Sequence, residues 1–274
     1  DQIAVLKSAQ VFALTSTQMA ALETRDIVAL TSAGIGALST DQISKGLGTA
    51  QIAALTTASI AALSTDQVSK GLTTDQIVAL RTDQVAALKT SQVAALTTDQ
   101  VAALETRDVA ALTSLAIGAL STDQISQGLT TAQIAALTTS QVVALNTDQV
   151  SAGLTTDQVV ALRTDQVSAL QTNQVIVLST DQLAAMETRD IAAVNTDAVG
   201  VLTTDQAAAL TTNQVVALTT AGVKALTVDH IAALSTDQVA AIESRDIAVL
   251  TTDQITALAP AQLSALTTVQ TSAL

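Results

Sequence analysis

An eight-residue unit repeats along the chain, and it constrains the fold more than any other feature. Lettered a to h, the unit has Leu at a, Thr at b and c, Asp at d, Gln at e, Val at f, and Ala at g and h, as in residues 96–103. Position a can be followed without a break from Leu6 to Leu274. The only extra residues are four inserted glycines: Gly46, Gly71, Gly128 and Gly153. Because so short a unit cannot fold alone, its copies must pack on one another.

Each octad carries the signals of one short helix. We expect the Thr or Ser at c to be the N-cap, because its hydroxyl can accept a bond from a free backbone N–H. The Asp at d would then be the first helical residue, where its charge is favourable at the positive end of the dipole. Position f and the next position a are three residues apart and share a helix face. The repeat therefore predicts an all-α solenoid with one helix of about one and a half turns per octad.

Two other arrangements fit the repeat less well. In one continuous helix, an octad would need four residues per turn against the real value of about 3.6, so the apolar stripe would drift around the surface. In a strand, the apolar positions f, h and a would not alternate as a half-buried strand requires. A β-solenoid is the main alternative to the helical solenoid.

Stacking of successive octads must supply the stability that the single helices lack. We expect the octads to wind into a superhelix, with positions a and f filling its axis and the small Ala at h permitting close approach. Position g accepts Ser69, Lys224 and Thr256, so it should face solvent. The pairs Gly46 and Gly71, and Gly128 and Gly153, are each 25 residues apart, which hints at three octads per coil.

The amino-acid composition agrees with a regular layered core and restricts the classes of binding partner. The 274 residues are 49% hydrophobic but include one Phe, Phe12, and no Trp or Tyr. The net charge of −13 disfavours nucleic acid and anionic membrane surfaces. No apolar run approaches the length of a membrane-spanning helix, and cysteine is absent. We expect residues 1–274 to form a single continuous solenoid that is a segment of a longer repetitive chain.

A charged variant of the octad recurs along the chain. Its motif Glu-Thr-Arg-Asp begins at Glu23, Glu105 and Glu187, at intervals of 82 residues, and a Ser variant begins at Glu243. We expect these charges to form clusters between neighbouring coils rather than ligand sites, and such surface pairs are individually weak. The candidate residues are Glu23, Arg25, Asp26, Glu105, Arg107, Asp108, Glu187, Arg189, Asp190, Glu243, Arg245 and Asp246.

No pattern in the sequence indicates catalysis or a cofactor. The carboxylates at d could gather calcium, but one per octad is sparse for an ion that takes about six to eight oxygen ligands. His230 is the only histidine and is expected to be a surface substitution. The inserted glycines are expected to relieve corners by adopting positive φ. Nucleophile-elbow, Walker and dinucleotide motifs are absent, so we expect no enzyme activity.

Two known repeat families resemble the chain. The stretch LTTDQVVAL, residues 154–162, resembles the opening helix of transcription-activator-like effector repeats. The second helix and the base-reading loop of that family have no counterpart here, and the acidic charge opposes DNA binding. All 274 residues resemble the Leu-Thr-Thr-Asp-Gln-Val-Ala-Ala arrays of very large bacterial secreted or surface proteins, described as adhesin-like. That resemblance implies an extracellular or cell-surface spacer, fibre or stalk.

The sequence leaves three functional hypotheses. The first is a non-enzymatic structural segment of a bacterial surface protein that forms a stalk or filament, by self-association or by continuation of the same repeat. The second is a solenoid scaffold that binds peptides or glycans in a groove. The third is ice or mineral binding by the paired threonines, which requires a flat β-type array.

Overall fold

A computed structural model describes residues 3–274 and contains only short helices and corners over that range. The chain divides into two compact units, unit 1 ending at Leu145 and unit 2 running from Asn146 to Leu274. The predicted all-α solenoid, with one helix per octad, is confirmed. The β-solenoid alternative is not supported, since the described residues form no strand. A flat β-type threonine array is therefore not present in them either.

The helices of unit 1 are mostly five to seven residues long. They are η1 (Ile3–Val5), α1 (Ser8–Phe12), α2 (Ser16–Ala20), α3 (Thr24–Ala29), α4 (Ser32–Gly36), α5 (Thr40–Gly46), α6 (Thr49–Ala54), α7 (Thr57–Ala62), η2 (Gln67–Gly71), α8 (Thr74–Val78), α9 (Thr82–Ala86), α10 (Thr90–Ala94), α11 (Thr98–Ala103), α12 (Thr106–Ala111), α13 (Ser114–Gly118), η3 (Gln124–Gly128), α14 (Thr131–Ala136) and α15 (Thr139–Val143).

The helices of unit 2 are equally short. They are η4 (Gln149–Gly153), α16 (Thr156–Val160), α17 (Thr164–Ser168), α18 (Thr172–Val175), α19 (Thr180–Ala185), α20 (Thr188–Ala193), α21 (Thr196–Gly200), α22 (Thr204–Ala209), α23 (Thr212–Ala217), α24 (Thr220–Ala225), α25 (Val228–Ala233), α26 (Thr236–Ala241), α27 (Ser244–Ile247), α28 (Thr252–Thr256), α29 (Pro260–Ala265) and α30 (Thr268–Thr271).

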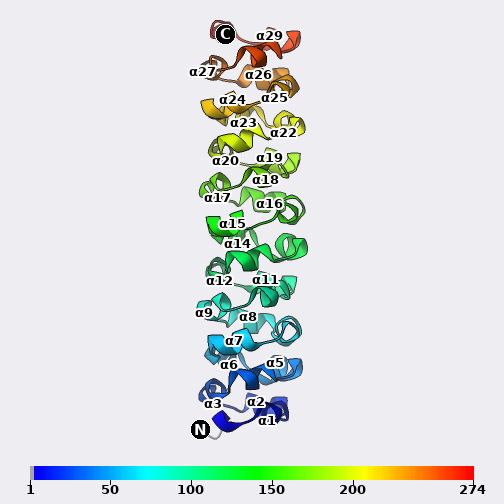
Figure 1. The fold of residues 1–274 in the computed structure, drawn as a ribbon, viewed down its shortest axis with the longest axis vertical. Coiled ribbons are helices and arrows are strands. Elements are labelled where there is room, and N and C mark those ends of the chain that lie inside the picture. Colours follow the sequence, from blue (N-terminus) through cyan, green and yellow to red (C-terminus); the bar gives the residue numbers. More distant parts are fainter. Residues whose placement is uncertain (1–2) are drawn as a thin grey trace. The chain divides into compact units, whose positions relative to one another are not determined.

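Within each unit a helix packs on the helix three places further along the chain. In unit 1, for example, α4 packs on α7 and α11 packs on η3, and in unit 2 α20 packs on α23. Three octads therefore complete one coil, as the glycine spacing suggested, and successive coils can be followed in Figure 1.

The core of each unit consists of positions a and f. At f, Ile52 and Val93 are fully buried, and at a, Leu55 and Leu104 are almost so. Position g is largely exposed, as at Lys224. The predicted inside and outside of the solenoid are thus confirmed at these positions, because f and a share the face that turns inward.

Helices begin one residue earlier than expected. In α11 the N-cap is Thr97 at position b, whose hydroxyl accepts from the backbone N–H of Gln100 at 3.2 Å. Position c is then the first helical residue, and the Asp at d is the second. The prediction of a cap at c was wrong because both positions carry hydroxyl residues, and only the helix geometry distinguishes them.

The prediction of positive φ at the inserted glycines was also wrong, since no described residue has positive φ. Three of them end π-helices, in which the extra residue is taken up by a wider turn, as in the bond from Leu129 N to Gln124 O at 3.0 Å. A Cβ at Gly128 would lie 3.1 Å from Val101 Cβ in the preceding coil. Glycine is needed at this point because two coils approach closely.

Candidate functional site

A corner is the turn that joins one helix to the next. Beside it lies a buried glutamine at position e, the third residue of the helix that follows, as Gln84 is in α9. Gln84 is fully buried, and its Oε1 accepts from the Arg81 backbone N–H, the N-cap of α9, at 2.8 Å. Its Nε2 donates to the carbonyls of Ile52 and Leu55, at 2.9 and 2.7 Å. One neutral amide thus bonds to the start of α9 and to the end of α6 in the adjacent coil, and helix ends are where backbone groups need partners from outside the helix.

The same two-sided contact recurs through both units. In each case Oε1 accepts from the N-cap N–H and Nε2 donates to carbonyls 28 to 33 residues earlier. The glutamines that do so include Gln42, Gln51, Gln67, Gln76, Gln84, Gln92, Gln100, Gln124, Gln133 and Gln141 in unit 1, and Gln182, Gln206, Gln214, Gln238, Gln254, Gln262 and Gln270 in unit 2.

His230 takes the place of this glutamine and is only 3% exposed. Its Nδ1 accepts from the Thr227 N–H at 3.1 Å, and its Nε2 lies 2.6 Å from the Leu202 carbonyl. This arrangement requires a neutral ring with the proton on Nε2. The expectation of a surface substitution was wrong, because the imidazole offers the same acceptor and donor as the amide.

Asn195 makes the contact to the neighbouring coil from another position. Its octad has Ala198 at e, which cannot reach the neighbouring coil. Asn195 Oδ1 instead accepts from the Ala198 N–H, and its Nδ2 donates to the Leu170 carbonyl, both at 2.8 Å. An amide at b can therefore replace the donor to the neighbouring coil that is missing at e, while its oxygen makes the ordinary N-cap bond.

The Glu-Thr-Arg-Asp octads place an aspartate at e. Asp108, Asp190 and Asp246 are 1% exposed. Each accepts from a threonine hydroxyl 26 residues earlier, at 2.7, 2.7 and 2.5 Å for Thr82, Thr164 and Thr220. Asp26, in the first such octad, is half-buried, and its Oδ2 accepts from the Glu23 N–H at 3.3 Å.

The arginines of these octads pair with the glutamate two residues before them. Arg25, Arg107, Arg189 and Arg245 lie 2.9, 2.6, 2.7 and 2.7 Å from Glu23, Glu105, Glu187 and Glu243, respectively. The glutamates and arginines thus meet within one octad. Contact between neighbouring coils comes from the aspartate and a threonine, which sequence reasoning did not anticipate.

Two further arginines, Arg81 and Arg163, lie at the N-cap position b, and Arg81 links two coils. In unit 1 the Arg81 guanidinium donates to the Ala53 carbonyl and to Asp83, whose Oδ1 lies 3.0 Å from Arg81 Nε. The hydrogen bonds from Arg81 lower the pKa of the Asp83 carboxyl below its ordinary value. Arg163 lowers the pKa of Asp165 in the same way.

A family model describes these octads. The ALTTAQ repeat model matches residues 19–57, 45–70, 71–106, 101–139, 127–152, 152–188, 183–220, 213–244 and 239–274. The chain belongs to the ALTTAQ repeat family. The six letters of that description correspond to positions h, a, b, c, d and e, and they end on the glutamine that is buried in the corners. No curated protein matches this ALTTAQ repeat chain.

Among solved structures, the leucine-rich repeat-containing protein LegL7 from Legionella pneumophila is 8% identical. The match covers 88% of the ALTTAQ repeat chain and 78% of LegL7, with a TM-score of 0.20. A TM-score this low carries no argument about the fold or the function of the ALTTAQ repeats.

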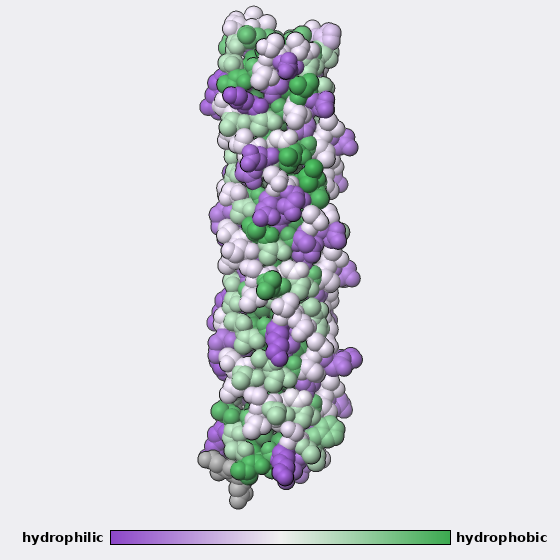
Figure 2. Space-filling view, viewed as in Figure 1, coloured by the Kyte–Doolittle hydropathy of each residue, from purple (hydrophilic) through white to green (hydrophobic). Residues whose placement is uncertain are grey.

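The ALTTAQ repeats place no metal-ligand cluster in residues 3–274, where no three of His, Cys, Asp or Glu lie together. The side chains at position d are exposed and belong to separate octads, as at Asp75 and Asp99. Across the same residues, no helix is long and apolar enough to cross a membrane. On the face shown in Figure 2, strongly hydrophilic residues are scattered rather than gathered in one patch.

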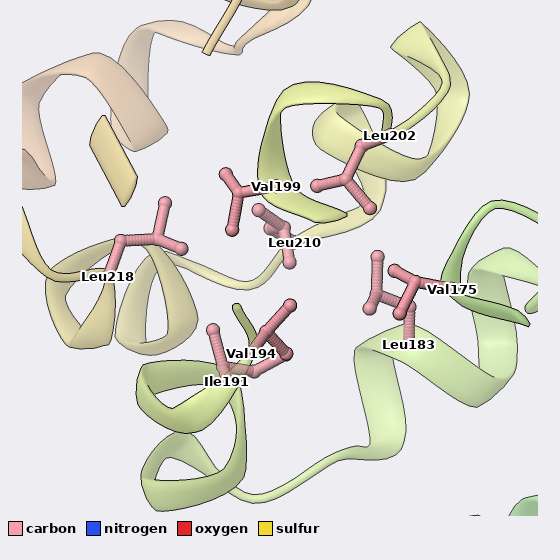
Figure 3. Close-up of a pocket in the computed structure, with 8 residues that line it drawn as sticks. All are labelled: Val175, Leu183, Ile191, Val194, Val199, Leu202, Leu210 and Leu218. Carbon is pink, nitrogen blue, oxygen red and sulfur yellow. The ribbon is translucent and has the colours of Figure 1, made fainter. Parts of the chain in front are cut away.

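A small apolar cavity lies within unit 2. Its volume is about 10 Å³, and Figure 3 shows its lining of Val175, Leu183, Ile191, Val194, Val199, Leu202, Leu210 and Leu218. Val194 occupies an a position, where most octads have the longer Leu. A space of this size without polar partners is expected to stay dry.

Proposed function

We propose that the chain is a non-enzymatic structural segment of a bacterial extracellular or cell-surface protein, in which stacked coils form a stalk or filament. The observation that carries this proposal is the two-sided glutamine contact. In each unit the buried polar groups of one coil find their partners in the next coil. These amides serve to join coils, and the family match consists of repeats alone.

The same contacts support assembly by further stacking. A coil face that lacks a neighbour leaves amide donors or backbone carbonyls without partners beside the Leu and Val side chains of a and f. Another coil, from the same chain or from a second copy, would satisfy both kinds of group. We therefore propose continuation of the repeat or end-to-end self-association.

Immunogold electron microscopy tests the location. Antibody against residues 1–274 would be applied to intact and to broken cells of the source organism, with a cytoplasmic marker protein as the control. Gold along external fibres of intact cells is expected. Labelling that appears only with the cytoplasmic marker, after breakage, would overturn the surface role.

Sedimentation velocity over a wide concentration range tests self-association of the purified chain. We expect oligomers whose masses are whole multiples of the chain mass and whose proportion rises with protein concentration. A monomer at all concentrations would refute end-to-end assembly and would leave continuation within one chain as the only route to a longer stalk.

A further inference from the structure

One carboxylate oxygen in unit 1 is buried without a hydrogen-bond partner. Asp108 is 1% exposed, and its Oδ1 accepts from the Thr82 hydroxyl at 2.7 Å. Arg107 Nε lies 3.9 Å from the same oxygen, beyond hydrogen-bond distance. Among the described groups nothing bonds to Oδ2. Because buried polar atoms almost always have partners, this oxygen requires an explanation.

The neighbouring octad shows what the corner normally contains. Gln100 Nε2 donates to the Leu72 carbonyl, 28 residues earlier, at 2.6 Å. The same register pairs Asp108 with Leu80, and Thr82 lies two residues after Leu80, so the carboxylate reaches the same corner. The aspartate side chain lacks the two N–H donors of a glutamine amide. Over the described chain no donor reaches the Leu80 carbonyl.

We propose that this corner binds one buried water molecule, which donates one hydrogen to Asp108 Oδ2 and the other to the Leu80 carbonyl. The water gives the Leu80 carbonyl the donor that a glutamine amide supplies to the corresponding carbonyl elsewhere. Buried waters of this kind typically make about three hydrogen bonds to groups that otherwise lack partners. A metal ion fits less well, since no second acidic side chain joins Asp108 in a ligand cluster within residues 3–274.

Two related octads of unit 2 share part of this arrangement. Asp190 and Asp246 make the same threonine contact as Asp108. The carbonyls 28 residues before them belong to Leu162 and Leu218. Among the described residues, however, the buried oxygen without a partner is found at Asp108, so the water is proposed there alone.

Crystallography of the whole chain tests the site directly. At a resolution that shows ordered water, we expect a density peak about 2.6–3.1 Å from both Asp108 Oδ2 and the Leu80 carbonyl oxygen. In the Asp108→Gln variant, the new glutamine amide should occupy the position of the water, so the density peak should be absent. The urea concentration at the midpoint of unfolding should rise. Asp99→Gln, at an exposed d position in the preceding octad, is the matched control and should change neither.

Two results would overturn the proposal. One is the absence of density at this point, with the Leu80 carbonyl bonded to a protein group. The other is an anomalous peak at the same position in crystals soaked with a thallium(I) salt, which would make the ligand a monovalent cation. A peak without anomalous signal supports water.

Discussion

At the scale of single residues, a glutamine is well suited to the corner because its amide is neutral and carries both an acceptor and two donors. Gln84 uses all of these functions while fully buried. A charged side chain would incur a larger desolvation cost there. An apolar one would leave the Arg81 N–H without its acceptor and would remove one donor from each of the Ile52 and Leu55 carbonyls.

Replacement of Gln84 by Ala should lower the free energy of unfolding by about 2–3 kcal/mol, because buried backbone groups lose their partners. Urea denaturation followed by circular dichroism measures the loss. Gln18→Ala is the control, since Gln18 is exposed and its amide bonds only within its own helix start, to Thr15. An equal loss in both variants would contradict a role for the amide between coils.

The pair of Arg81 and Asp83 should contribute an acid-sensitive part of the stability. Because the pKa of Asp83 is lowered in the folded chain, the stabilisation is present above the unfolded pKa and is lost as the pH falls through the folded value. The stability difference between the natural chain and Arg81→Gln should therefore shrink as the pH falls below the ordinary carboxyl pKa of 3.8 and through the lowered pKa of Asp83. Urea midpoints across this range measure it, and a difference independent of pH would contradict the prediction.

The sequence predicted the apolar half of the core but not its polar half. Leu at a and Val at f were recognisable from their spacing and hydrophobicity. Gln at e and His230 were not, because polar residues are usually exposed and nothing in one octad shows which carbonyls lie in the next coil. The constancy of Gln at e was the available signal.

At the scale of the helix, stability depends on both ends having partners, because a helix of five or six residues is not stable alone. The sequence predicted one helix per octad correctly. It did not predict the N-cap position, since b and c both carry Thr in most octads. Nor did it predict the π-helices, which depend on how coils approach one another at Gly128.

Helix α13 has Ala116 at position e, where most helices have the buried glutamine, although its N-cap Thr113 is of the usual kind. Ala116→Gln should restore a bond to the Thr113 N–H and a donor for the Leu88 carbonyl at the usual register. We expect a gain of about 1–2 kcal/mol in urea denaturation. Ala116→Leu adds similar bulk without an amide and should give no gain. Equal stabilisation by both variants would attribute the effect to packing alone.

The cavity in unit 2 offers a packing test. Val194→Leu adds one methylene beside the space of about 10 Å³ and should stabilise the chain by about 1 kcal/mol. The fully buried Val239 is the control, because Val239→Leu should overpack its site and destabilise by about 1–3 kcal/mol. Thermal melts compare the two, and destabilisation by Val194→Leu would show that the cavity cannot take the extra group.

At the scale of the whole molecule, energies depend on neighbouring coils, so coils should be removable as units. Deletion of residues 202–225, three complete octads of unit 2, joins position h of one octad to position a of another. Helical circular dichroism per residue should be retained, with a smaller urea m-value because less surface is buried. Deletion of residues 202–205, half an octad, shifts the repeat out of register. This variant should show less helical circular dichroism per residue. Similar losses in both variants would contradict modular stacking.

The three-octad coil also has a consequence for heredity. Recombination between copies that are nearly identical adds or removes whole octads, and after any multiple of three the surviving side chains meet partners of the same kind as before. Gene length can then drift between lineages without compensating substitutions elsewhere. The number of coils then becomes a trait that populations can adjust by copy number alone.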